Sequence, residues 1–244
     1  MDETDQNTSR PDLTHQATQQ WLDAGDAHYE REVYAEALGA YVRAIQLDPT
    51  DVSAYIMIGH TLFQLEYYEE ALLAYQEALH RKADSAYIRN CKGNALYRLH
   101  RYGQALSAYQ QALHLDADEA IFHYNKGTVL ICLNRYEEAL AAFEQALRLN
   151  PSDAYAYNSA GHALYQMQHY EQALKSYEQA IQIDSEEVTF HYNRAKVLAF
   201  LERGEEALAA FEAVIRLEPH NAKNYTHKAH LLCKLQRYEE ALMA

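Results

Sequence analysis

The chain has 244 residues and carries 21 Lys and Arg against 35 Asp and Glu, a formal net charge of −14 with neutral His. A field of that sign repels phosphate backbones, so we expect no nonspecific binding to nucleic acid. The three Cys lie far apart without a CxxC pair, which favours a reduced compartment over a disulfide framework, and no apolar run approaches the roughly 18 residues of a membrane span.

Residues 1–17 are acidic and polar and carry no repeat. They lack the basic start and the apolar stretch of a secretory signal peptide. A segment with so few apolar residues cannot bury enough surface to order itself. We therefore predict a flexible tail over 1–17, no membrane association and a cytoplasmic protein.

From Thr18 onward the chain repeats itself every 34 residues without insertion or deletion. An Ala-Leu pair marks the period, from Ala37-Leu38 to Ala241-Leu242. We set the frame so that this Ala is the twentieth position, which gives six full repeats over 18–221 and a truncated seventh over 222–244. The repeats start at Thr18, Val52, Ala86, Ala120, Ala154, Val188 and Ala222.

Other frame positions are typical of a packed helix pair. The eighth position is always Gly or Ala, as a close helix crossing requires, and the twenty-fourth is always Tyr or Phe. Pro49, Pro151 and Pro219 stand at the thirty-second position, where a helix must stop. Apolar residues follow helical spacing, with a first helix over frame positions 1–14 and a second over about 18–31. Glu137 and Glu138 open a second helix, where negative charge complements the helix dipole.

These residues resemble the tetratricopeptide repeat, whose signature runs from an aromatic and a small residue through Ala, an aromatic and Ala to Pro at a spacing of 34. The resemblance covers 18–244 and implies an all-α fold, a right-handed α-solenoid superhelix of antiparallel helix pairs. Arg89, His123 and His191 depart from the first aromatic position, and Gly204 replaces a Tyr. The resemblance also implies a concave groove lined by the first helices.

Charge is distributed unevenly between the two kinds of helix. The predicted first helices of repeats two to seven contain no Asp or Glu, whereas the second helices and turns carry the acids. We therefore predict a neutral-to-basic groove in an acidic protein. Asn suits the backbone of an extended peptide and Tyr is common at interfaces. The candidate peptide-binding residues are Tyr87, Asn90, Asn94, Arg98, Tyr124, Asn125, Thr128, Tyr155, Asn158, His162, Tyr192, Asn193 and Lys196.

The function expected from this groove is that of a non-enzymatic scaffold that binds a protein or peptide, with a preference for acidic or carboxylate-ended segments. The competing interpretation is a generic scaffold sequence whose contact surface lies elsewhere. The carboxylate clamp of chaperone adaptors matches poorly, because Asn90 stands where its first Lys is expected and Tyr155 and Ser159 replace its last Lys and Arg. Closure of the superhelix around a small peptide is a third possibility.

No motif indicates catalysis, a cofactor or a metal. His227, His230 and Cys233 share one helix face without a known ligand set, and Cys91 and Cys132 have no paired base. The chain stops eight residues into a second helix, although solenoids normally finish with a polar cap. We therefore expect either a fragment, such as the targeting or regulatory segment of a larger enzyme or signalling protein, or self-association through the uncapped repeat.

Overall fold

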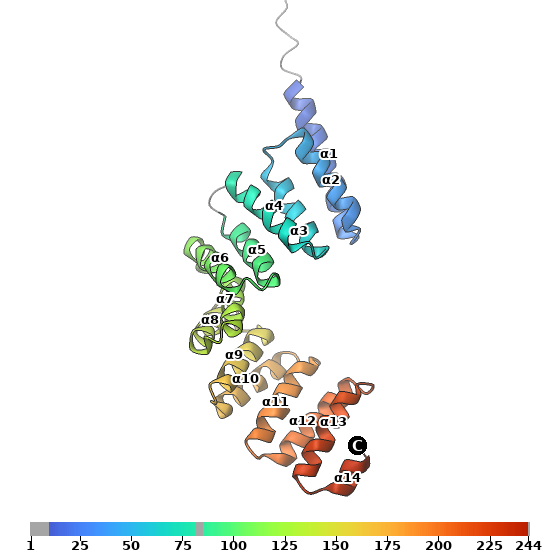
Figure 1. The fold of residues 1–244 in the computed structure, drawn as a ribbon, viewed down its shortest axis with the longest axis vertical. Helices are drawn as coiled ribbons and strands as arrows, with labels where there is room; N and C mark the ends of the chain where they lie inside the picture. Colours follow the sequence, from blue (N-terminus) through green and yellow to red (C-terminus); the bar gives the residue numbers. More distant parts are fainter. Residues whose placement is uncertain (1–9, 82–84, 244) are drawn as a thin grey trace, which may run out of the picture. The chain divides into compact units, whose positions relative to one another are not determined.

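The computed structural model describes residues 10–81 and 85–243, and all regular structure in that part of the chain is helical (Figure 1). Helices come in pairs, and each pair is one 34-residue repeat. The first helices of repeats two to seven begin at the predicted residues, Val52 to Ala222. The helices are α1 (Arg10–Glu30), α2 (Tyr34–Leu47), α3 (Val52–Gln64), α4 (Tyr68–Arg81), α5 (Ala86–Arg98), α6 (Tyr102–Leu115), α7 (Ala120–Cys132), α8 (Tyr136–Leu149), α9 (Ala154–Gln166), α10 (Tyr170–Ile183), α11 (Val188–Phe200), α12 (Gly204–Leu217), α13 (Ala222–Lys234) and α14 (Tyr238–Met243).

The chain divides into two compact units, Met1–Ala117 and Asp118–Ala244. Unit 1 holds α1–α6 and unit 2 holds α7–α14. Within each unit the two helices of a repeat pack together, and the second helix packs on the first helix of the next repeat. The buried side chains of unit 1 include Tyr41, Tyr75 and Tyr109, and those of unit 2 include Phe143 and Phe190.

Local hydrogen bonds explain where the helices begin and end. Asp51 and Asp153 cap α3 and α9, since each side chain accepts from a backbone N–H three residues later at 2.9 Å. Each first helix ends in a left-handed residue at frame position 15, with φ between 56° and 64°. The N–H of the next residue donates to the carbonyl five residues back, as from Arg135 to Leu130 at 2.9 Å. This is a Schellman end, which Gly usually forms, but here the left-handed residue is Glu, His, Asn or Gln.

The predicted close helix crossing is confirmed at the eighth frame position. A Cβ built on Gly127 would lie 2.6 Å from Cε1 of Phe143, and one on Gly93 would lie 2.5 Å from Cε1 of Tyr109. The ring at frame position 24 therefore lies directly against the backbone of the first helix. Packing of this kind leaves no room for a side chain and couples the two helices of a repeat.

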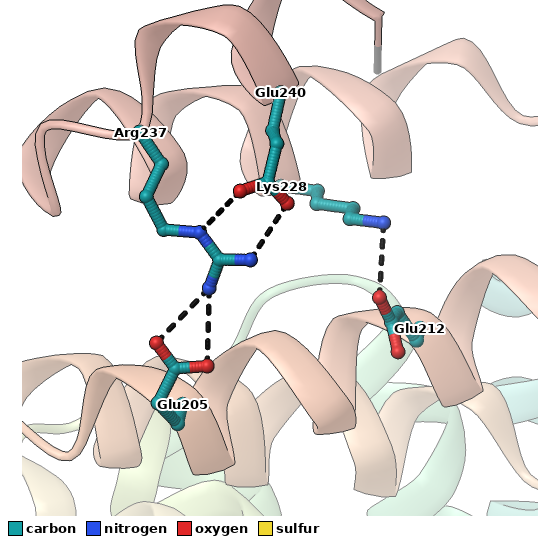
Figure 2. A network of polar contacts seen from close by, with 5 residues as sticks. All are labelled: Glu205, Glu212, Lys228, Arg237 and Glu240. Carbon is teal, nitrogen blue, oxygen red and sulfur yellow. Dashed lines mark hydrogen bonds and ion pairs between the residues drawn. The ribbon is translucent and has the colours of Figure 1, made fainter.

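Arginines at frame position 16 link neighbouring repeats on the outside of each unit. Arg101 reaches Glu69 at 2.9 Å in unit 1, and Arg237 reaches Glu205 at 3.0 Å in unit 2. Figure 2 shows that Arg237 also holds Glu240 in α14 through two hydrogen bonds. The short last helix is thus tied to α12 by one guanidinium.

Two features differ from the sequence expectation. Residues 10–17, assigned to the flexible tail, form the first turns of α1; residues 1–9 lie outside the described part. Gly204, which replaces a Tyr, does not leave a void. A Cβ there would meet Leu235 Cδ2 at 2.5 Å, so the Leu235 side chain occupies the space.

Candidate functional site

The candidate site lies on the exposed sides of the first helices, which we call the A-helix face. In unit 1 it is formed by α3 and α5, and in unit 2 by α7, α9, α11 and α13. None of these helices contains Asp or Glu, as the sequence predicted. Exposure is greatest at frame positions 2 and 13, exemplified by Tyr87, Tyr155 and Phe200. Positions 5 and 6 are mostly half-buried in the seams between helices.

In unit 1 the predicted Tyr87 takes part in a hydrogen-bond chain with a histidine that the sequence analysis did not single out. Tyr87 Oη lies 2.9 Å from His60 Nε2, and His60 Nδ1 lies 2.9 Å from the hydroxyl of buried Tyr75. Burial lowers the pKa of His60, because desolvation disfavours its charged form. His60 therefore bridges repeats two and three as a neutral imidazole.

The other predicted residues of unit 1 are less available to a ligand. Asn90 is only 5% exposed, so little of its side chain is accessible to a ligand. Asn94 accepts a hydrogen bond from the Tyr109 hydroxyl at 2.7 Å and thus supports the packing of its own repeat. Arg98 is exposed, and its guanidinium lies 4.5 Å from the centre of the Tyr68 ring.

Frame position 9 follows a rule that sequence reasoning missed. Where frame position 24 is Tyr41, Tyr75 or Tyr109, position 9 supplies a polar partner for its hydroxyl, as Asp26 does for Tyr41 at 2.7 Å. Where position 24 is Phe, position 9 is Thr128 or Lys196, and Thr128 bonds to the carbonyl of Tyr124 in its own helix. The signal was present in the sequence as a paired change fifteen residues apart.

In unit 2 several predicted residues are brought together in pairs. Asn193 donates to the side-chain oxygen of Asn158 at 2.8 Å, which joins repeats five and six. Tyr155 donates to the Glu187 carboxylate at 3.1 Å, and Tyr192 Oη lies 3.3 Å from His227 Nε2. These contacts hold the A-helix face in a fixed arrangement. Tyr124, Asn125 and Thr128 on α7 are half-buried.

Two adjacent cavities meet at Lys196. The first, of about 150 Å³, is lined by His162, Tyr165, Gln166, Tyr177, Asn193 and Lys196. The second, of about 200 Å³, shares Tyr165 and Lys196 and extends over Phe200 to α13. The Lys196 ammonium lies 5.1 Å from the centre of the Tyr165 ring. We call the two together the Lys196 site.

The Lys196 site is cationic and aromatic. Its lining residues include no carboxylate, and within the described part of the chain Lys196 forms no ion pair. The pKa of His162 is lowered by burial and by the charge of Lys196, so at neutral pH Lys196 is charged and His162 is not. Sequence analysis named His162, Asn193 and Lys196 of this set. The frame also points Tyr165, Gln166, Ala199 and Phe200 into the groove, but the sequence analysis did not place there Tyr177, Phe211, His227, His230, Leu231 and Lys234.

The cysteines and histidines are the candidates for a reactive thiol and for a metal site. Cys132 and Cys233 are exposed. Cys91 is buried, and burial raises the pKa of its thiol to about 11, so it stays protonated at neutral pH. Across residues 10–81 and 85–243, no three His, Cys, Asp or Glu gather in a group that could hold a metal ion. No helix in the same ranges combines the length and apolar character needed to cross a bilayer.

Comparisons with known proteins place the repeats in one family. Models described as tetratricopeptide repeat match residues 92–154, and also 52–85 and 188–221; a model described as TPR repeat matches 25–66 and 161–201. No curated protein sequence matches significantly.

Solved structures similar to this chain are repeat proteins. The crystal structure of YrrB, described as a TPR protein with an unusual peptide-binding site, is 25% identical, with a TM-score of 0.64 over 78% of this chain and 97% of its own. Pseudomonas aeruginosa PilF is 20% identical, with a TM-score of 0.75 over 89% and 99%. A tetratricopeptide repeat protein from Parabacteroides merdae is 17% identical, with a TM-score of 0.76 over 93% and 89%. The last two likenesses concern the fold alone.

Proposed function

Because the chain belongs to the tetratricopeptide repeat family, we propose that it is a protein-interaction scaffold whose A-helix face in unit 2 binds a segment of a partner protein. The observation that carries the proposal is the Lys196 site, two adjoining cavities without a carboxylate in a protein of charge −14. The likeness to YrrB, whose description names a peptide-binding site, supports it.

The chemistry of the site favours a segment with an acidic group next to an apolar side chain. Lys196 and Lys234 provide positive charge for a carboxylate, either a side chain or a chain end. Phe200 and Leu231 offer an apolar surface beside them. The Asn193 amide lies where an extended backbone could exchange hydrogen bonds with it. Tyr87, Arg98 and the other predicted residues of unit 1 stay predictions.

Titration of matched peptides tests the proposal. We expect labelled peptides that combine Asp or Glu with Leu or Phe to bind more tightly than the same peptides with Lys in place of the acids. Lys196→Gln should weaken the acidic peptides by about threefold or more, the range of a partly exposed ion pair. Lys175→Gln on the exposed side of α10 removes the same charge and is the matched control. A consistent preference for basic peptides, or equal effects of the two variants, would refute the proposal.

Self-association through the last repeat stays a prediction. In α14, Leu242 is 90% exposed and Met243 is 81% exposed. If this surface pairs chains, light scattering should show a mass above that of one chain that falls on Leu242→Ser. A monomer at all concentrations would exclude it.

A further inference from the structure

A cation and a carboxylate meet across two of the three repeat junctions of unit 2, both times at the same spacing. Arg194 Nε lies 3.5 Å from Glu178 Oε1. Figure 2 shows the second pair, in which Lys228 Nζ lies 3.1 Å from Glu212 Oε1. In both pairs the cation is at frame position 7 and the carboxylate is sixteen residues earlier, at position 25 of the preceding repeat. Each half-buried cation is therefore neutralised by the neighbouring repeat.

In unit 1 the same two positions hold Lys92 and Gln76, so an amide stands where unit 2 has a carboxylate. Both residues line one cavity of about 290 Å³ between α4, α5 and α6. Among the residues that the structure describes, Lys92 forms no ion pair and no hydrogen bond. A half-buried ammonium thus faces a cavity with no carboxylate to neutralise it.

The remaining lining of this cavity is suited to an anion. Gln104, Ser107 and Gln111 project from α6, and Gln111 already donates to Ser107 Oγ at 3.4 Å and accepts from Arg89 at 2.6 Å. The Gln104 amide and the Ser107 hydroxyl remain as donors. Arg101 lies at the edge, where Glu69 holds its guanidinium at 2.9 Å. Leu72, Leu96 and Ala108 form the apolar part of the lining.

The two helices of repeat three contain no acid, which sets this repeat apart from its neighbours. Residues 85–115 contain no Asp or Glu, although the chain has 35 of them. Of the second helices that the structure describes, α6 alone has none. Gln76 lines the cavity from α4, a helix that itself carries Glu69, Glu70 and Glu77, whereas α5 and α6 supply no carboxylate.

We propose that this cavity, the Lys92 site, binds a carboxylate side chain from an acidic segment of a partner protein. The bound carboxylate takes the place that Glu178 and Glu212 occupy in unit 2. One unpaired cation matches the single charge of a carboxylate better than the double charge of a phosphate. A second copy of this chain is disfavoured as the partner, because two molecules of charge −14 repel each other.

The test uses the full chain and a peptide of alternating Glu and Ala with both ends blocked. Binding is followed by the side-chain amide NMR signals of Gln104 and Gln111. Gln76→Glu supplies the carboxylate from within the chain, so we expect the fold to be retained and the affinity to fall by about fivefold or more. Lys92→Gln should weaken binding similarly. Gln145→Glu, the same charge change on the exposed side of α8, should leave the affinity within about twofold.

Two controls separate binding at this site from binding elsewhere, and three outcomes would refute the proposal. The peptide with Gln for Glu should not bind, and Lys196→Gln should not alter the signals of Gln104 and Gln111, which separates this site from the proposed peptide site of unit 2. The proposal is overturned if Gln76→Glu binds like the wild type, if the Glu peptide leaves both signals unchanged, or if inorganic phosphate binds as tightly as the Glu peptide.

Discussion

Replacing Gly127 in α7 by Ala is expected to destabilise unit 2, although Ala is the better helix former. A Cβ at this position would lie 2.6 Å from Cε1 of Phe143 and 2.8 Å from its Cδ1 and Cζ. Phe143 is fully buried on α8, so its ring cannot swing away into solvent. The substitution therefore forces the two helices of repeat four apart.

The magnitude follows from two opposing effects. Ala in place of Gly inside a helix gains about 0.5–1 kcal/mol, because less backbone entropy is lost on folding. Overpacking of a close-packed core costs about 1–3 kcal/mol. The expected net result is a loss of about 1 kcal/mol. Gly103→Ala in α6 is the control, because nothing lies within 4 Å of its Cβ and the helix-propensity gain should appear alone.

Native-state hydrogen exchange is the appropriate measurement, since repeat arrays do not unfold in one step. Amides of α7 and α8 should exchange faster in the Gly127→Ala variant, and amides of α6 more slowly in the Gly103→Ala variant. Ala195 already faces Phe211 in repeat six, so this position tolerates Ala where the helices are spaced for it. The reasoning is refuted if Gly127→Ala stabilises α7 and α8 as much as Gly103→Ala stabilises α6.

Three further predictions concern stability. Burial holds the pKa of His60 below the unfolded value of about 6.5. The stabilisation from neutral His60 is therefore fully present above that pH and is lost as the pH falls toward the folded pKa. In urea titrations at about pH 7.5 and 5.5, His60→Asn should lose less stability between the two pH values than the wild type. Gln168→Gly removes the backbone strain of a left-handed residue with φ of 63° and should stabilise unit 2 by about 0.5–1 kcal/mol, measured from the denaturant midpoint. As a control, Gln172→Gly inside α10 should destabilise unit 2 by about 1 kcal/mol. Arg237→Ala removes the ion pairs to Glu205 and Glu240 and should speed amide exchange across α14, and unchanged exchange would show that packing alone holds this helix.

The architecture was predictable because each of its causes recurs in the sequence. A period of 34 residues places the first-helix starts of repeats two to seven, and Val52 and Ala222 begin helices as expected. The small residue at frame position 8 and the ring at position 24 are in contact, as in Gly93 with Tyr109. A contact that recurs at the same frame positions in every repeat appears in the sequence as a periodic pattern, even where the surrounding residues differ.

The site was less predictable, because a frame position specifies a helix face and not the depth of a side chain. Asn90 and Asn158 both stand at frame position 5, yet Asn90 is buried whereas Asn158 is half-buried and bonded to Asn193. Depth depends on the side chains of adjoining helices, which differ between repeats. Phe200 at frame position 13 was expected to face the groove, and it is 58% exposed.

The spacing of sixteen residues explains why the Lys92 site could be recognised only after the fold was known. No sequence pattern links position 7 with position 25 of the preceding repeat. The structure shows that the two positions are in contact, as in Lys228 and Glu212. At the first junction of unit 1 the same positions hold Ile58 and Val42, which pack in one apolar cluster. Within the two units the pair is apolar, ionic or, in Glu144 with Ala160 and Gln76 with Lys92, singly charged, and only Gln76 with Lys92 leaves a cation unmatched.

This comparison yields one more prediction. Gln76→Val combined with Lys92→Ile copies the pair of Val42 and Ile58, so unit 1 should keep its fold and its stability should rise, because an unpaired half-buried charge is replaced by apolar contacts. Binding of the blocked Glu peptide should be lost in the same variant. A denaturant midpoint below that of the wild type would show that Lys92 is already well solvated, and retained peptide binding would place the anion site elsewhere.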